Sequence, residues 1–89
     1  MAYVKRILIS EAYKVMLHNE ITGADIMFYS EIIEKPLGNV GLNRVTLNNL
    51  KHGVKIADST KEKFLRALNF ALKKQGSKRQ YIKHELWKI

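Results

Sequence analysis

The chain has 89 residues, of which 46% are hydrophobic, and a formal net charge of +8. This length supports one small domain with a single modest core and excludes two separate cores. Because there is no cysteine, disulfides and thiolate metal sites are excluded. With no signal-like N-terminus and no long apolar run, we expect a cytoplasmic protein that does not span a membrane.

The positive charge is concentrated in the second half of the chain. Residues 1–36 carry four Lys or Arg against five Asp or Glu, residues 37–72 carry six against two, and residues 73–89 carry six against one. Such a charge favours a polyanionic partner, because each cation placed near a phosphate can release a condensed counterion. A ribosomal or other RNA-binding role would produce the same charge.

The N-terminal segment is compatible with two structures. Its apolar residues recur at helical spacing at Val4, Ile7, Leu8, Ala12, Val15 and Met16. Residues 3–10, YVKRILIS, are also rich enough in β-branched and aromatic residues to form a short strand. Between these alternatives we expect a helix over about residues 4–18.

A second helix is predicted over Gly23–Glu34. Thr22 followed by Asp25 is a capping-box pattern, which marks the start of the helix. Pro36 stops it, because proline lacks a backbone donor and restricts the residue before it. The residues expected to face the core are Ile26, Tyr29, Ile32 and Ile33.

Residues 35–41, KPLGNVG, predict a glycine-containing loop longer than a tight turn, and residues 41–53, GLNRVTLNNLKHG, predict a short helix. Asn43 can cap the start of this helix, and Gly53 can take the left-handed conformation that ends it. The helix has a narrow apolar face formed by Leu42, Leu47 and Leu50.

The outward face of that short helix presents arginine and asparagine. Arginine matches the acceptor pair of guanine, asparagine matches the donor and acceptor of adenine, and an aliphatic methyl can contact thymine. The candidate residues for base edges are Arg44, Val45, Asn48 and Asn49. Other residues are candidates for phosphates, whose contacts position a protein without reading sequence; these are Asn43, Thr46, Lys51, Lys55, Lys78 and Arg79. The simpler interpretation is a solvated helix that contacts nothing.

A further helix is predicted after the short one. Ser59 with Glu62 forms another capping-box pattern, and the helix is expected to end near Gly76. Its core-facing stripe contains Phe64, Leu65, Leu68, Ala71 and Leu72.

The basic C-terminal tail, about residues 77–89, carries more apolar residues than a disordered segment should. It fits a short helix with Ile82, Leu86 and Ile89 inward, or a strand, and the pattern does not decide between them. We expect the tail to pack on the core or on a second copy of the chain, with Trp87 as its anchor.

The sequence contains little that supports a catalytic function. His18, His52 and His84 are scattered, no metal-ligand spacing appears, and the five glycines form no phosphate-binding loop. We therefore expect a protein that is not an enzyme and that has no metal or cofactor.

Residues 41–72, GLNRVTLNNLKHG followed by VKIADSTKEKFLRALNFAL, resemble the second half of a Cro and phage-repressor type (XRE-like) helix-turn-helix domain. In that family a Gly, an apolar residue and a small polar cap open the recognition helix, a Thr-aliphatic pair lies in its middle, and an aliphatic residue and a Gly close it. The matching residues are Gly41, Leu42, Asn43, Thr46, Leu47, Leu50 and Gly53, with Ala67, Leu68 and Asn69 in the family's Ala-Leu-Asn element. The turn before Gly41 departs from the family, because Leu37 occupies a position that is often small.

The resemblance implies a single all-α domain over residues 1–89 with four or five helices. It also implies a sequence-specific double-stranded DNA-binding transcriptional regulator, a repressor of phage or mobile-element type. Such a protein would insert the helix of residues 43–52 into the major groove, and we expect it to act as a homodimer. Two alternatives stay open: a basic RNA-binding or nucleoid-type protein, and a small phage protein that uses the same fold to inhibit another protein.

Overall fold

The computed structural model describes residues 10–53 and 55–87, and this part of the chain is helical with no strand. It contains α1 (Glu11–His18), α2 (Gly23–Glu34), the 3-10 turn η1 (Lys35–Leu37), α3 (Arg44–Lys51), α4 (Asp58–Lys74) and α5 (Lys83–Leu86). The prediction of a small all-α domain is confirmed. Within the same ranges, no helix is long and apolar enough to cross a membrane.

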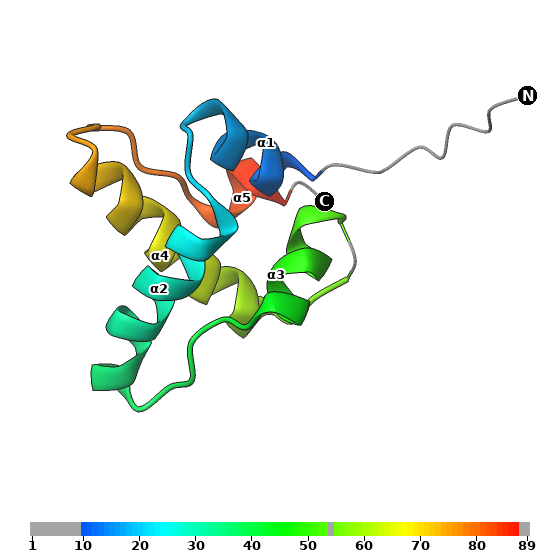
Figure 1. Cartoon of the computed structure of the whole chain (residues 1–89). Helices are drawn as coiled ribbons and strands as arrows, with labels where there is room; N and C mark the ends of the chain where they lie inside the picture. The colour runs from blue at the N-terminus through cyan, green and yellow to red at the C-terminus, as the bar shows by residue number, and fades with distance from the viewer. Residues whose placement is uncertain (1–9, 54, 88–89) are drawn as a thin grey trace, which may run out of the picture.

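The longest helix, α4, crosses α2 and packs against it, and the shorter helices α1, α3 and α5 lie around this pair (Figure 1). Every α-helix contributes to one hydrophobic core. Its buried side chains include Ala12, Met16, Ile26, Leu47, Leu50, Phe64, Ala67, Leu68, Ala71, Leu72 and Leu86. The core-facing stripe predicted for α4 is thus largely confirmed.

The first helix is shorter than predicted. Ser10 has an extended backbone (φ −69°, ψ 161°), and its Oγ accepts the Tyr13 N–H at 3.1 Å. This cap satisfies one of the free N–H groups of the first turn, so the helix begins at Glu11 and does not run through Ser10. The prediction of one continuous helix over residues 4–18 is therefore wrong, and residues 4–9 lie outside the described part of the chain.

The second helix has the predicted bounds and capping box. The Asp25 N–H donates to Thr22 Oγ1 at 3.1 Å, and the Thr22 N–H donates to Asp25 Oδ2 at 3.2 Å. The core-facing stripe was predicted less well, because Ile32 is 48% exposed. The buried positions recur every four residues along another face, at Ile26, Ser30 and Glu34.

The helix α4 starts two residues earlier than a cap at Ser59 predicts. The Ala57 carbonyl accepts the N–H groups of Thr60 and Lys61, both at 3.1 Å, so α4 begins at Asp58. Ser59 is therefore inside the first turn, where its side chain cannot cap the helix. The predicted Ser59–Glu62 capping box does not form.

The C-terminal segment packs on the domain. Leu86 is buried, and the Trp87 indole lies edge-on to Phe64 with ring centroids 6.0 Å apart. Of the two structures that the sequence allowed, the described part of the tail adopts the short helix α5. Ile82, expected to face inward, is exposed, and Ile89 lies outside the described residues.

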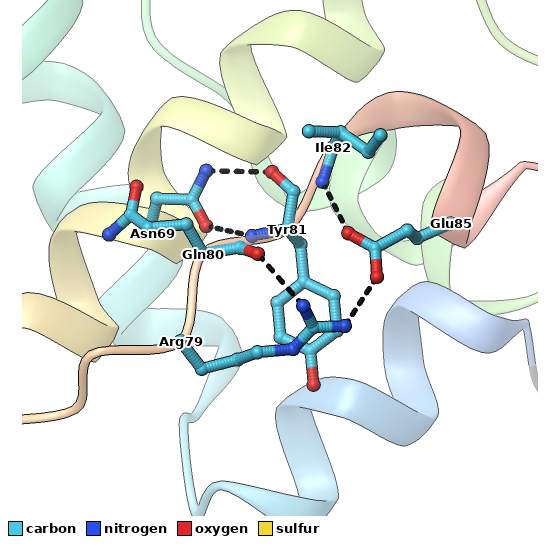
Figure 2. Close-up of polar contacts among 6 residues, drawn as sticks. All are labelled: Asn69, Arg79, Gln80, Tyr81, Ile82 and Glu85. Carbon is cyan, nitrogen blue, oxygen red and sulfur yellow. Dashed lines mark hydrogen bonds and ion pairs between the residues drawn. The ribbon is translucent and has the colours of Figure 1, made fainter.

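Side chains hold the segment that leads into α5 (Figure 2). Asn69 Oδ1 accepts the Tyr81 N–H at 2.8 Å, and Asn69 Nδ2 donates to the Tyr81 carbonyl at 3.0 Å. Arg79 forms an ion pair with Glu85, whose Oε1 accepts the Ile82 N–H at 3.0 Å. The hydrogen bond from Arg79 lowers the pKa of Glu85 below its ordinary value.

Candidate nucleic-acid interface

The candidate reading helix, α3, has the predicted ends. Asn43 Oδ1 accepts the Thr46 N–H at 2.8 Å at its start, and Gly53 takes the left-handed conformation (φ 71°) just after its end. Leu47 and Leu50 are buried in the core together with the preceding Leu42. One face of this short helix is therefore fixed against the domain, as its leucine spacing predicts.

The chain entering α3 is held tightly against α2. The Leu42 N–H donates to the buried Ser30 Oγ at 2.9 Å. Gly41 approaches the same helix so closely that a Cβ atom there would lie 2.8 Å from Glu31 Cα and 2.9 Å from Glu31 N. A side chain at this position would have to displace backbone, so the placement of α3 depends on glycine at position 41.

A buried carboxylate anchors the start of the loop between α2 and α3. Glu34 is fully buried and accepts hydrogen bonds from Arg66 Nε at 2.7 Å and Arg66 Nη2 at 2.8 Å. Asn39 Nδ2 donates to the same carboxylate at 2.9 Å. The Arg66 hydrogen bonds lower the pKa of Glu34, although burial acts in the opposite direction. This cluster joins α2, α4 and the loop.

The first helix braces the other end of α3. The Ser10 N–H donates to the Lys51 carbonyl at 2.9 Å, and Lys51 Nζ lies 4.8 Å from the centroid of the Tyr13 ring. The carbonyl contact satisfies one of the free acceptors of the last turn, and the ring contact is a cation–π interaction. Both ends of α3 are therefore fixed by neighbouring elements.

The outward face of α3 carries the residues predicted to contact base edges. Arg44, Val45 and Asn48 are exposed, Val45 at 70%, and Asn49 is half-buried at the margin of this face. Positions 44 and 48 are one helical turn apart, so these side chains share one surface. An α-helix with its side chains is about 10 to 12 Å in diameter, which fits the width of the major groove of B-DNA.

The chain segment that contains α3 is basic, and acidic side chains of other elements lie near its two ends: Glu31 lines a hollow with Asn43, and Glu11 lines the hollow that contains Lys55. Residues 38–57 include Arg44, Lys51 and Lys55 and no Asp or Glu. Beyond the C-terminal end of α3, Lys55 lines a hollow of about 580 Å³ together with Lys61. Asp58 also lines this hollow, 3.8 Å from Lys61, so its charge is partly balanced.

The predicted phosphate contacts fall into two groups. One group lies on or beside α3 and consists of Asn43, Thr46, Lys51 and Lys55. Lys78 and Arg79 belong to the segment between α4 and α5, which lies away from α3 (Figure 1). Arg79 is engaged by Glu85, and its guanidinium lies 4.2 Å from the centroid of the Tyr81 ring. Contacts of this second group with DNA stay a prediction.

The residues that position α3 were not predicted from the sequence. Tyr13, Ser30, Glu34 and Arg66 received no role, yet they hold its two ends or the loop before it. Ser30 offered one signal, because it is a polar residue four positions after Ile26 on the buried face. Nothing local marks Glu34, whose partner Arg66 lies 32 residues further along the chain.

Comparisons with models of protein families, with curated proteins and with solved structures found no match to this chain. The helix-turn-helix resemblance over residues 41–72 therefore stays a prediction.

Proposed function

We propose that the chain is a cytoplasmic, sequence-specific double-stranded DNA-binding transcriptional regulator that inserts α3 into the major groove. In this proposal it is a repressor of phage or mobile-element type and acts as a homodimer. One observation carries the proposal: Arg44, Val45 and Asn48 are exposed together on a helix whose opposite face is buried. The helix is also held at both ends, which keeps the exposed face in one orientation.

Each exposed side chain suits one element of a base-pair edge. Arg44 can donate two hydrogen bonds to O6 and N7 of guanine, and Asn48 can pair with N6 and N7 of adenine. Val45 offers methyl groups to the C5-methyl of thymine. Asn49, at the half-buried margin, would contact a base at the edge of the same site.

The neighbouring polar groups suit phosphates. Because Asn43 Oδ1 is used by the helix cap, its Nδ2 group is the atom that can donate to a phosphate oxygen. Thr46 is half-buried beside it, and Lys51 and Lys55 supply positive charge near the other end of α3. These contacts would fix the register of the protein on DNA without selecting a sequence.

A homodimer follows from the small size of the reading surface. A single eight-residue helix reads only a few base pairs, whereas two copies related by a two-fold axis read a palindromic site. We therefore expect the preferred site to be a palindrome or a near-palindrome.

The test is selection of bound duplexes from a random DNA pool at physiological salt. The wild type is compared with Arg44→Ala and with Lys73→Ala, a control that removes one exposed positive charge from α4. We expect the wild type to enrich a motif, and Arg44→Ala to bind that motif about 5- to 150-fold more weakly while relaxing one position of it. Lys73→Ala should keep the motif.

Other outcomes identify the alternatives. Equal weakening of Arg44→Ala on every sequence would make Arg44 a phosphate contact. Binding that depends only on salt, with no enriched motif, would overturn sequence-specific reading and favour the RNA-binding or nucleoid-type protein. Absence of any nucleic-acid binding would favour the protein-inhibitor alternative.

A further inference from the structure

The outward side of α2 carries an apolar surface that extends to α4, where Lys74 Nζ lies 5.5 Å from the centroid of the Phe70 ring. Phe28 is 61% exposed, and Ile32 lies one turn further on the same face. Tyr29 continues this surface toward α4, with its ring 5.7 Å from Phe28 and 5.1 Å from Phe70 between centroids. Ile33 lines the same hollow as Phe70. We call Phe28, Tyr29, Ile32, Ile33 and Phe70 the α2 surface.

The size of the α2 surface suits a weak, specific contact. Its side chains together expose on the order of 300 Å² of apolar area, which is the size of a functional patch on a small monomer. Two such surfaces and their polar rims would bury on the order of 1,000 Å², in the range of transient protein interfaces. The area therefore fits a partner that associates reversibly.

The charge distribution allows a second copy of the chain to approach the α2 surface, and the flank of this surface selects it. Two copies with a net charge of +8 repel each other through most of their surfaces. Within Gly23–Glu34 there is no Lys or Arg, and Glu31 is an exposed acid, whereas Glu34 is buried against Arg66. Positive side chains lie at the α4 edge of the α2 surface, where Arg66 and Lys73 line the hollow beside Phe70. Two copies can therefore approach through the Phe28–Ile32 face of α2 with less repulsion than through the basic faces of α3 and α4.

The flank of the α2 surface is self-complementary. Glu31 and Lys35 are both exposed and lie four residues apart on the flank away from α4. A two-fold axis perpendicular to two antiparallel helices places each flank against the same flank of the second copy. If Ile32 meets Ile32 of the second copy, Phe28 lies opposite Pro36 and Glu31 lies opposite Ile33. Glu31 is then about 3 Å along the helix axis from Lys35 of the second copy, within reach of both side chains.

We propose that the α2 surface binds the α2 surface of a second copy, antiparallel and centred near Ile32, with Glu31 paired to Lys35 in both directions. This inference rests on the proposed function only in that both require a dimer, and its test contains no DNA. The proposed dimer surface differs from the C-terminal segment, which was the other candidate for a contact between copies. Trp87 of that segment packs on Phe64 of its own chain.

The first test is sedimentation velocity over a range of protein concentrations. We expect the wild type to pass from monomer to dimer, and Phe28→Ser and Ile32→Ser each to weaken dimerisation about tenfold or more. Leu17→Ser is the matched control, because Leu17 is a similarly exposed apolar residue on α1. Far-ultraviolet circular dichroism reports whether each variant keeps its helices.

The second test exchanges charges. Glu31→Lys and Lys35→Glu should each weaken dimerisation about tenfold, because each places like charges together twice. Mixing these two variants in equal amounts should restore the dimer, since every pair then joins a Lys to a Glu. The double variant should also dimerise alone.

Three results would overturn this inference. A wild type that stays monomeric at the highest soluble concentration excludes the second copy and assigns the α2 surface to another occupant. A dimer that tolerates both serine variants uses another surface, and a mixture that does not recover refutes the antiparallel register. If the dimer forms but no DNA motif is selected, the proposal of sequence-specific DNA binding is refuted and the proposed dimer surface is not.

Discussion

Replacement of Gly41 by alanine tests whether the close approach of the loop to α2 positions α3. The new Cβ would lie 2.8 Å from Glu31 Cα, whereas ordinary contacts of a Cβ begin at 3.4 Å. Because the obstructing atoms are backbone atoms within α2, the loop has to move instead. That movement pulls the Leu42 N–H away from Ser30 Oγ, which it contacts at 2.9 Å.

The magnitude follows from these two effects. Overpacking at a site that cannot relax costs about 1 to 3 kcal/mol, and leaving a buried N–H without its acceptor costs a similar amount. Because displacement of the loop relieves part of the overpacking, we expect the free energy of unfolding to fall by about 2 to 4 kcal/mol. This is a large part of the about 5 to 15 kcal/mol that stabilises a small domain.

The assay is urea denaturation followed by far-ultraviolet circular dichroism, which reports the loss of helix throughout the domain. Gly38→Ala is the matched control. Gly38 has a left-handed backbone (φ 77°) and nothing within 4 Å of the position of a Cβ, so its replacement adds backbone strain of about 1 kcal/mol without a clash. A Gly41→Ala variant at least as stable as Gly38→Ala would refute the reasoning.

Two further predictions concern Glu34 and Asn43. The pKa of Glu34 is lowered in the folded state from 4.5, so its contribution to stability is present above pH 4.5 and is lost as the pH falls through the lower folded value. Glu34→Gln should therefore unfold more easily at neutral pH and lose less stability on acidification. An acid dependence equal to that of the wild type in urea titrations would contradict this prediction. Asn43→Ala should lower the free energy of unfolding by about 1 kcal/mol, because the helix cap is lost, whereas Asn43→Asp should retain the cap. Equal stability of Asn43→Ala and the wild type in the same assay would show that the cap does not stabilise α3.

The features that the sequence predicts well are local. Thr22 and Asp25 bond each other's backbone across one turn, and Asn43 and Gly53 mark the ends of α3 within a few residues of chain. Such signals act through neighbouring backbone atoms, so distant packing changes them little. The exposed side chains of α3 follow from the same reasoning, because its leucines leave only one face outward.

Features that depend on distant partners could not be predicted in this way. α2 has apolar residues on most of its circumference, so periodicity alone could not show that Ile32 faces outward. Burial of Glu34 requires Arg66 on α4, and the bracing of Lys51 requires Tyr13 on α1. Ser59 does not cap α4, because the Ala57 carbonyl accepts the first hydrogen bonds of the helix and Ser59 lies inside the first turn.

The paired contacts between Asn69 and Tyr81 have a consequence for how the domain opens. The side-chain amide of Asn69 bonds both backbone groups of Tyr81, as an adjacent strand would do. The tail thus depends on a side chain of α4 and on the packing of Trp87 against Phe64. Leu86 adds one buried side chain to this attachment. We therefore expect residues 77–87 to detach as one unit before α2 and α4 unfold, and the Tyr81 amide to exchange with solvent before the amides of the central helices.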